Sequence, residues 1–452
     1  MNQNLYSDPR TRQFLLPVHI VWQSDGDAAP EASDALLVNN TGQCRFGSIA
    51  VCRIRHAGGI LLDFGRELHG GIQLVTAHTE DKRPVRVRVR FGESVSEAMS
   101  EPVNDHSMHD EVCYLPWCGS QEIGNTGFRF VRIDALDADR ELALIAVRAV
   151  SLMRDLPYRG RFTCDDERLN RIWQTGAYTT HLCLQEYVWD GIKRDRLVWI
   201  GDMHPITMVA TTVFGDVSVV RDSLDFVRDN TPLPGWMNGI SSYSIWWMLI
   251  QTNWYLYHGN LAYLAEQQTY LTSLLRQLLA CVDEQGSEKL ADWRFLDWPS
   301  SENPEAIHVG LHALLSIALA AGADLCATLK EEELRQQCLG AVQLLSNHRP
   351  ELRRESKQAS SLLALAGLVD PAVANAQVLA CDPYHGVSTF FGYYILQARA
   401  LAGDYAGALD LIRRYWGGML DMGATTFWED FDVSWMENAA RIDELVPPGK
   451  KD

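Results

Sequence analysis

The sequence has no surplus of positive charge. Its 452 residues hold 40 Lys and Arg against 58 Asp and Glu, which leaves a formal net charge of −18. A protein that binds nucleic acid needs a basic surface that neutralises phosphate groups. The charge balance therefore argues against nucleic acid as a partner.

Clustered cysteines are also absent. The ten cysteines include no Cys-x-x-Cys pair and no group of Cys and His at the spacing of a metal site. We expect reduced and mostly buried thiols, no bound metal and no cofactor.

Targeting and membrane signals are missing as well. The N-terminal residues lack the basic stretch followed by an apolar run that marks a secretory signal. No apolar run reaches the roughly 18 residues of a membrane span. We therefore predict a cytoplasmic protein that does not associate with membranes.

What is present is the composition of an ordinary globular protein, with 47% hydrophobic and 22% charged residues. In the first third, short runs rich in Val and Ile alternate with turn residues, as in 59–65, 85–92 and 128–136. This pattern is typical of antiparallel strands, and we predict a jelly-roll-like β-sandwich over residues 1–155. In 81–90 the valines alternate with arginines, which predicts one buried and one half-solvated face.

After Leu156 and Pro157 the apolar period becomes helical. From Leu169 to Thr180 apolar residues recur at i, i+3, i+4 and i+7, and about ten similar stretches follow. Antiparallel helix pairs in this number either stack as a solenoid or close into a ring. Because no fixed-period repeat appears, we favour a ring of helices over residues 156–452.

Three aspartates lie in the loop between the first two predicted helices, residues 187–205. Asp190, Asp195 and Asp202 alternate there with Lys, Arg and two tryptophans. Tryptophan faces stack on the C–H face of a sugar ring, while carboxylates and guanidinium groups bind its hydroxyls. The alternative is an ion-pair network that ties the loop to its neighbours, and Asp202 could instead cap the next helix.

Other loops have the same mixture of acidic and aromatic residues. Residues 423–435 hold Glu429 and Asp430 between aromatic residues, and 234–247 and 292–305 are rich in tryptophan. In a ring of helical hairpins, the loops at one end converge on a central cavity. We therefore expect these loops to face one another around one site.

Two of these loops resemble those of the bacterial α-L-rhamnosidases, glycoside hydrolase family 78. The resemblance is carried by Asp-Gly-Ile-Lys-Arg-Asp-Arg-Leu-Val-Trp-Ile-Gly-Asp (190–202) and Gly-Ala-Thr-Thr-Phe-Trp-Glu (423–429). Residues 61–71 and 127–133 look like the β-sandwich that precedes the catalytic domain in that family, and 162–173 looks like its first barrel helix. The resemblance implies an (α/α)6 six-hairpin barrel, an inverting reaction and no metal in that reaction.

The resemblance also assigns roles by position. Asp195 matches the general acid and Glu429 the general base, although Asp195 is one methylene shorter than the Glu of many relatives. Asp190, Arg194 and Asp202 match residues that bind the rhamnose hydroxyls. Further substrate-binding candidates come from the aromatic loops: Trp199, either Trp246 or Trp247 as a wall near the sugar methyl group, Asp297, Trp298 and Trp428.

The chemistry of an inverting hydrolase agrees with these roles. One protonated carboxyl group donates to the leaving oxygen, and one carboxylate deprotonates a water on the opposite face of the sugar. Near neutral pH, Asp190 and Asp202 would help to keep a proton on Asp195, while Arg194 and Arg196 would oppose this. The geometry of the loop decides which effect prevails.

The sequence ends at Asp452, where relatives continue through a His-Gly-Trp segment to the last barrel helix. We therefore expect a barrel that lacks its last helix. The leading function is an exo-acting, inverting α-L-rhamnosidase for small rhamnosides such as disaccharides and plant glycosides. The alternatives are a non-catalytic rhamnoside-binding protein and an inverting enzyme for another sugar. The N-terminal unit either packs against the barrel or mediates a homodimer.

Overall fold

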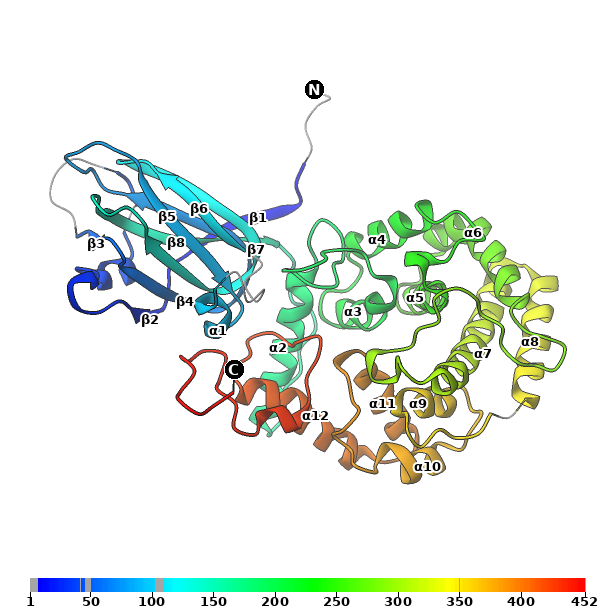
Figure 1. Ribbon diagram of the computed structural model, residues 1–452. Helices are drawn as coiled ribbons and strands as arrows, with labels where there is room; N and C mark the ends of the chain where they lie inside the picture. Colours follow the sequence, from blue (N-terminus) through cyan, green and yellow to red (C-terminus); the bar gives the residue numbers. More distant parts are fainter. Residues whose placement is uncertain (1–6, 41, 45–49, 102–108, 349, 452) are drawn as a thin grey trace, which may run out of the picture.

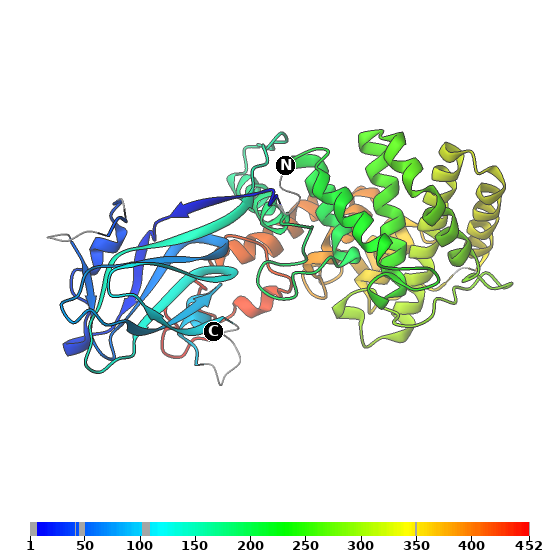
Figure 2. The ribbon, with the colours of Figure 1, turned by 90° about the horizontal axis from the view of Figure 1, so that it is seen from above.

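The chain forms a strand-rich unit followed by a helical unit, and the two lie side by side (Figure 1, Figure 2). The last strand ends at Arg154 and the first long helix begins at Glu167. The segment after the last long helix returns to the strand-rich unit, where Val95 N donates to Ile442 O (2.8 Å). The computed structural model describes residues 7–40, 42–44, 50–101, 109–348 and 350–451.

The strand-rich unit is an eight-stranded antiparallel sheet with the order β1-β8-β4-β7-β5-β6. In addition, β2 pairs with β4 and β3 pairs with β8, both antiparallel. The predicted antiparallel strands are therefore confirmed. The strands are β1 (Arg10–Leu15), β2 (His19–Gln23), β3 (Cys52–Ile54), β4 (Gly59–Thr76), β5 (Val85–Gly92), β6 (Asp110–Leu115), β7 (Gly119–Ala135) and β8 (Leu142–Arg154).

A bulge interrupts β4 beside β7. The pairing register shifts there, so that residues 64–67 of β4 lie opposite the single residue Arg129 of β7. Bulges bend a strand and re-aim its groups, often next to a functional site. Here the backbone of Glu67 faces the helical unit, where its N–H donates to Thr425 Oγ1 (2.8 Å).

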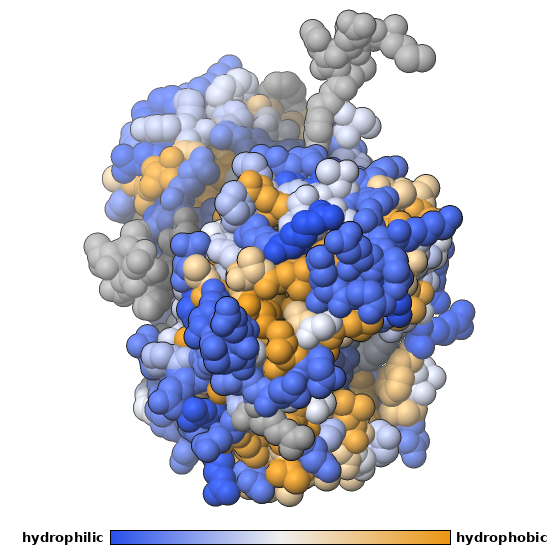
Figure 3. Space-filling model, turned by 90° about the vertical axis from the view of Figure 1, so that its right-hand side faces the viewer, coloured by the Kyte–Doolittle hydropathy of each residue, from blue (hydrophilic) through white to orange (hydrophobic). Residues whose placement is uncertain are grey.

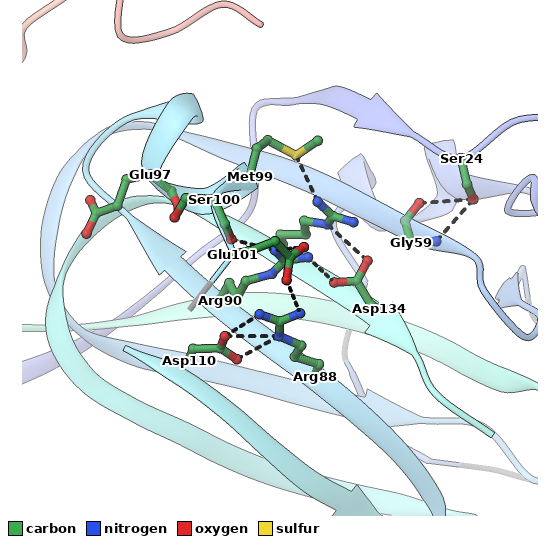
Figure 4. A network of polar contacts seen from close by, with 11 residues as sticks. Ser24, Gly59, Arg88, Arg90, Glu97, Met99, Ser100, Glu101, Asp110 and Asp134 are labelled. Atoms are coloured by element: carbon green, nitrogen blue, oxygen red, sulfur yellow. Dashed lines mark hydrogen bonds and ion pairs between the residues drawn. The ribbon is translucent and has the colours of Figure 1, made fainter. Parts of the chain in front are cut away.

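The strand β5 has its valines in the core of the sheet. Val87 and Val89 are fully buried, which confirms the buried face of the prediction. The other face is not solvated along its whole length, because helix α1 (Val95–Met99) packs over it. Arg90 is buried there and donates to Asp134 (2.7 Å), within a network of arginine and acid pairs (Figure 4). The expectation of a half-solvated face is therefore wrong at the inner end of the strand.

The helical unit contains each of the helical stretches predicted from the sequence. Alternate helices pack on one another in succession: α3 on α5, α5 on α7, α7 on α9, α9 on α11, and α11 on α3. Helices α4, α6 and α8 pack against this inner set, and α12 packs on α2 and α11. The helices are α2 (Glu167–Cys183), α3 (Ile200–Val213), α4 (Ser218–Asp229), α5 (Ser241–His258), α6 (Leu261–Leu279), α7 (Pro304–Leu329), α8 (Glu332–Asn347), α9 (Lys357–Leu365), α10 (Pro371–Ala374), α11 (Thr389–Leu401) and α12 (Tyr405–Asp421).

His204 joins three of the inner helices. Its Nδ1 lies 2.8 Å from the Tyr394 hydroxyl of α11, and its Nε2 lies 2.9 Å from Asn253 Nδ2 of α5. Because the amide of Asn253 donates to Nε2, the ring carries its proton on Nδ1. Burial lowers the pKa of His204 to about 4, so the ring is neutral near pH 7. The ring therefore links α3, α5 and α11 without a buried charge.

Helix α7 is long and apolar enough to cross a membrane by length and composition alone. The prediction that no stretch reaches the length of a span is wrong by this criterion. In this fold 78% of its apolar 18-residue window is buried inside the protein. Helix α8 packs over α7, and on that side of the molecule hydrophilic residues surround a patch of hydrophobic ones (Figure 3). The apolar composition of α7 thus reflects its place in the core.

Replacing His204 with Leu would leave the Tyr394 hydroxyl and the Asn253 amide without this buried partner. We expect the free energy of unfolding to fall by about 3 kcal/mol, since each orphaned buried polar group costs about 1–3 kcal/mol. Urea unfolding followed by tryptophan fluorescence measures the change. The control is Arg335→Ala, which removes an exposed pair with Glu332 and is expected to change stability by less than about 0.5 kcal/mol. If His204→Leu lowered the free energy of unfolding by no more than the control does, the central role of this ring would be contradicted.

Candidate active site

The loops that precede the inner helices meet at one end of the helical unit. Ser388, the N-cap of α11, donates to Asp297 Oδ2 in the loop before α7 (2.5 Å). Gln358, in the first turn of α9, donates to the same oxygen (3.2 Å). Thr389 of α11 donates to Trp428 O in the segment after α12 (2.6 Å). The acidic and aromatic loops therefore surround one region of the molecule.

Residues 190–197, which we call the acid loop, form a closed loop that presents Asp195. The N–H of Asp190 donates to Leu197 O (3.1 Å), and its Oδ1 accepts from Leu197 N (2.8 Å). Asp195 and Arg196 both adopt left-handed backbone angles, with φ of 51° and 56°. Few residues other than Gly, Asn and Asp adopt this conformation readily. Asp195 is exposed at this turn.

Residues 423–430, which we call the base loop, present Glu429. Gly423 begins the loop with φ of 93°, and a Cβ there would lie 2.8 Å from Asp443 Oδ1, so the position requires glycine. The N–H of Phe427 donates to Thr179 Oγ1 of α2 (3.0 Å). Glu429 is exposed two residues after Phe427, the residue that this hydrogen bond ties to α2.

Asp202 lies in the first turn of α3 and does not cap it. The helix begins at Ile200, and the side chain of Asn238 supplies the missing contacts. Asn238 Oδ1 accepts from Ile200 N (3.1 Å), and its Nδ2 donates to Val198 O (3.1 Å). The capping role considered for Asp202 is therefore wrong, because a residue from another loop fills it. Asp202 is left to face the other acidic residues.

The carboxylates of these loops perturb one another. Burial raises the pKa of Asp190 to about 6, and the charge of Asp195 adds to the rise. Burial raises the pKa of Asp202 to about 7, with further contributions from Asp190, Glu429 and Asp297. Burial also raises the pKa of Asp297 to about 6. The pKa values of these carboxyl groups are therefore raised toward neutral pH, a condition suited to acid and base chemistry.

The structure divides the predicted tryptophans into two sets. Trp298 is 60% exposed, and Trp199 and Trp428 are half-buried at the loops. In contrast, Trp246 and Trp247 are exposed by only 1% and 0%. The two buried rings belong to the core, which corrects the expectation that one of them forms a wall for the sugar.

The contacts of these two rings explain their burial. Trp246 packs against both His204 and Tyr394, with ring centroids 5.2 Å and 4.8 Å away. Trp247 points toward α4 and donates its indole N–H to Leu224 O (3.2 Å). Neither ring is open to a sugar in this arrangement.

Two further polar side chains of these loops and helices, Arg194 and Tyr243, differ in their exposure. Arg194 is exposed in the acid loop. Sequence reasoning missed Tyr243, which is 6% exposed in the first turn of α5. Burial raises the pKa of Tyr243, and the charges of Asp202 and Asp297 raise it further. It also missed Asn238, for which the Asn-Gly pair at 238–239 was the available signal of a turn.

A metal-based site is not indicated by the described residues. Within the described ranges, no group of three or more His, Cys, Asp or Glu side chains could hold a metal ion. The chemistry available to this region is that of its carboxyl groups, its tyrosine and its exposed indole rings.

Comparison with known proteins confirms the resemblance predicted from the two loops. Residues 157–334 match the family model of the bacterial alpha-L-rhamnosidase 6-hairpin glycosidase domain. A rhamnosidase from Klebsiella oxytoca with rhamnose bound has a similar structure, with a TM-score of 0.80 and 21% identity over 98% of this chain and 92% of that chain. No curated protein matches the sequence.

Two longer proteins are also similar in structure. The family 78 rhamnosidase of Bacillus sp. GL1 has a TM-score of 0.72 and 21% identity, over 88% of this chain and 45% of its own. The α-L-rhamnosidase of Aspergillus terreus has a TM-score of 0.69 and 17% identity, over 88% of this chain and 50% of its own. This chain thus spans about half the length of these two proteins. At such identities the likeness establishes a rhamnosidase-type glycosidase fold.

The raised pKa of Asp202 predicts a pH dependence of stability. A carboxyl group whose pKa is higher in the folded state contributes stability below its unfolded pKa of 3.8, and this contribution is lost as the pH rises toward about 7. We expect the free energy of unfolding to fall between pH 5 and 7, and Asp202→Asn to remove up to about 2 kcal/mol of that fall. Urea unfolding at both pH values measures it.

The matched control is Asp222→Asn on the outer helix α4, where Asp222 is exposed. This variant should keep the pH dependence of the parent protein. If Asp202→Asn kept the pH dependence too, the raised pKa of Asp202 would not be its source.

Proposed function

We propose that this chain is an exo-acting, inverting α-L-rhamnosidase that removes terminal rhamnose from small rhamnosides such as disaccharides and plant glycosides. The observation that carries the proposal is the meeting of the acid loop and the base loop around Asp202, whose pKa responds to Asp190 and Glu429. The match of residues 157–334 to the rhamnosidase domain and the fold shared with a rhamnose-bound enzyme support the choice of sugar.

In this proposal, Asp195 and Glu429 carry the reaction. Asp195 donates its proton to the glycosidic oxygen as the bond from that oxygen to the anomeric carbon breaks. Glu429 accepts a proton from a water that attacks the opposite face of the sugar, so that the anomeric configuration inverts. The two carboxyl groups of an inverting enzyme stand roughly 6.5–9.5 Å apart, which leaves room for the water.

The neighbouring residues bind the sugar. Asp190, Arg194 and Asp202 hydrogen-bond its hydroxyls, because carboxylates accept from them and a guanidinium group donates to them. Asp297 is fixed by Ser388 and the amide of Gln358, so it supports the floor of the site. Trp298, with 60% of its surface exposed, offers a face for the leaving group.

The finer architecture belongs to the same proposal. We infer that the inner helices form the (α/α)6 barrel of a six-hairpin glycosidase and that the sheet folds as a β-sandwich, with the boundary at residues 155 and 156. Helix α11 packing back on α3 supports the closed arrangement. A cytoplasmic location and a homodimer are further expectations, which fractionation and light scattering test.

The catalytic assignment predicts large losses of activity. Glu429→Gln and Asp195→Asn should each lower kcat/KM for an aryl α-L-rhamnoside by about 10²–10⁴-fold, the usual contribution of a general acid or base. Hydrolysis is followed by release of the phenol, and proton NMR of the first product identifies the anomer, expected to be β.

The control for these variants is Glu437→Gln, which alters an exposed glutamate eight residues after Glu429. It should hydrolyse the substrate at the parental rate. Full activity in either catalytic variant would refute the assignment. Saturable rhamnose binding by a parent protein without turnover would favour the alternative, a rhamnoside-binding protein.

The place of Trp298 predicts a separate effect on binding. Trp298→Ala should raise KM about 5–10-fold for an aryl rhamnoside and leave kcat nearly unchanged, because a stacked ring contributes about 1 kcal/mol or more to binding alone. The control is Tyr405→Ala, which removes a comparably exposed ring (66%) at the start of α12, outside these loops. A fall in kcat with constant KM would contradict a binding role for Trp298.

A further inference from the structure

The strand-rich unit contacts both loops of the proposed site. The contacts come from β7, at the alternate residues Asn125, Gly127 and Arg129. Asn125 and Gly127 touch the acid loop, and Arg129 touches the base loop. In this part of β7, Thr126, Gly127 and Phe128 pair with β4, and the pairing with β5 begins at the next residue after Arg129.

Lys193 anchors the acid loop to this unit. Its Nζ lies 2.5 Å from Glu97 Oε1 and donates to Phe91 O (3.4 Å) at the end of β5. The side chain is only 6% exposed, so the ion pair is shielded from solvent. The loop also lies close against the strand, because a Cβ at Gly127 would approach Ile192 Cγ1 to 2.9 Å.

A second contact holds the tip of the acid loop. Arg196 donates from Nη1 to Asn125 O (2.9 Å), and its guanidinium lies 5.8 Å from the centre of the Trp189 ring. Asp195 lies in the sequence between Arg196, which makes this contact, and the exposed Arg194. The residues on which its orientation depends, Lys193 and Arg196, are therefore both bound to the strand-rich unit.

Arg129 anchors the base loop in a comparable way. Its Nη1 donates to Gly423 O (3.0 Å), the first residue of that loop. Its other nitrogens form a bidentate pair with Asp63, at 2.9 Å and 2.8 Å, and both side chains are buried. Two residues further along the loop, Thr425 Oγ1 accepts from Glu67 N in the bulge of β4 (2.8 Å).

We propose that the strand-rich unit is a positioning part of the catalytic centre, in which β7 and its neighbours fix the acid loop through Lys193 and the base loop through Arg129. This inference rests on the proposed function. Asn125 and Gly127 of β7 contact the acid loop and Arg129 of the same strand holds the base loop, so a single strand carries contacts to both loops.

The acid-loop anchor predicts a dependence on the leaving group. An aryl rhamnoside with a poor leaving group, such as phenol, needs a proton from Asp195, whereas a 2,4-dinitrophenyl rhamnoside departs without one. In Lys193→Met we expect kcat/KM to fall about 30–100-fold for the phenyl substrate and less than about 3-fold for the dinitrophenyl substrate, because a small misplacement of a catalytic group costs about 10²-fold. Equal losses on both substrates would overturn this half of the proposal.

The base-loop anchor predicts the opposite pattern. Arg129→Lys keeps a positive charge beside Asp63 but cannot hold that carboxylate with two nitrogens and also reach Gly423 O. We expect equal losses of about 10-fold or more on both substrates, since both need an activated water. Thr425→Val, which removes only the hydroxyl that accepts from Glu67 N, should give a smaller loss of the same kind. A leaving-group dependence in these variants would overturn this half.

The control is Arg88→Met on strand β5. Arg88 is partly buried and pairs with Asp110 (2.5 Å) in the network of Figure 4, away from both loops. Its loss should destabilise the sheet to an extent comparable with Lys193→Met while leaving kcat/KM for both substrates within about 2-fold. A merely structural role for Lys193 predicts that the two variants behave alike, and that result would also overturn the proposal.

A second measurement does not depend on turnover. Hydrogen exchange followed by mass spectrometry should show faster exchange in residues 190–197 of Lys193→Met, with 423–430 unchanged, and the converse in Arg129→Lys. Unchanged exchange in both loops would overturn the anchors. A parent protein that hydrolyses no rhamnoside would refute the proposed function, while the exchange data would still decide whether the strand-rich unit holds the two loops.

Discussion

The repulsion among carboxylates in a confined place is the constraint on which the rest of this structure depends. Asp190, Asp202 and Asp297 have raised pKa values because burial and neighbouring charges both disfavour ionisation. A chain that brings such groups together must hold them against a force that drives them apart. The helix core, the cross-linked loops and the contacts with the sheet are the means by which this fold does so.

The core and the loops are held together by different kinds of interaction. In the core, a neutral His204 joins three helices through hydrogen bonds that leave no charge buried. At the loops, the anchors are charged: Lys193 of the acid loop pairs with Glu97, and Arg129, which pairs with Asp63 within the sheet, donates to Gly423 O of the base loop. Such pairs add little to net stability, but breaking one is costly, so they fix the geometry of what they hold.

Much of this could be predicted from the sequence, because the relevant signals are local. The change from alternating strands to a helical period near residue 156, the helical stretches and the two acidic loops follow from spacing alone. Two predictions made from the sequence were wrong. Helix α3 begins at Ile200, so Asp202 is not its cap, and one face of β5 is covered by α1. In the first case Asn238, which is distant in sequence, replaces a local cap, and in the second α1, the next element along the chain, replaces water.

The sequence by itself therefore determined the kinds of element and the residues able to do acid and base chemistry. Only the tertiary structure decided which of the tryptophans lie open and which are buried, since Trp247 and Trp298 differ in neighbours and not in chemistry. It also decided that Lys193 and Arg129 meet loops and carboxylates far away in the chain. Periodicity reports how a residue faces its own helix or strand, whereas burial and charge pairing depend on segments that the chain brings together only when it folds.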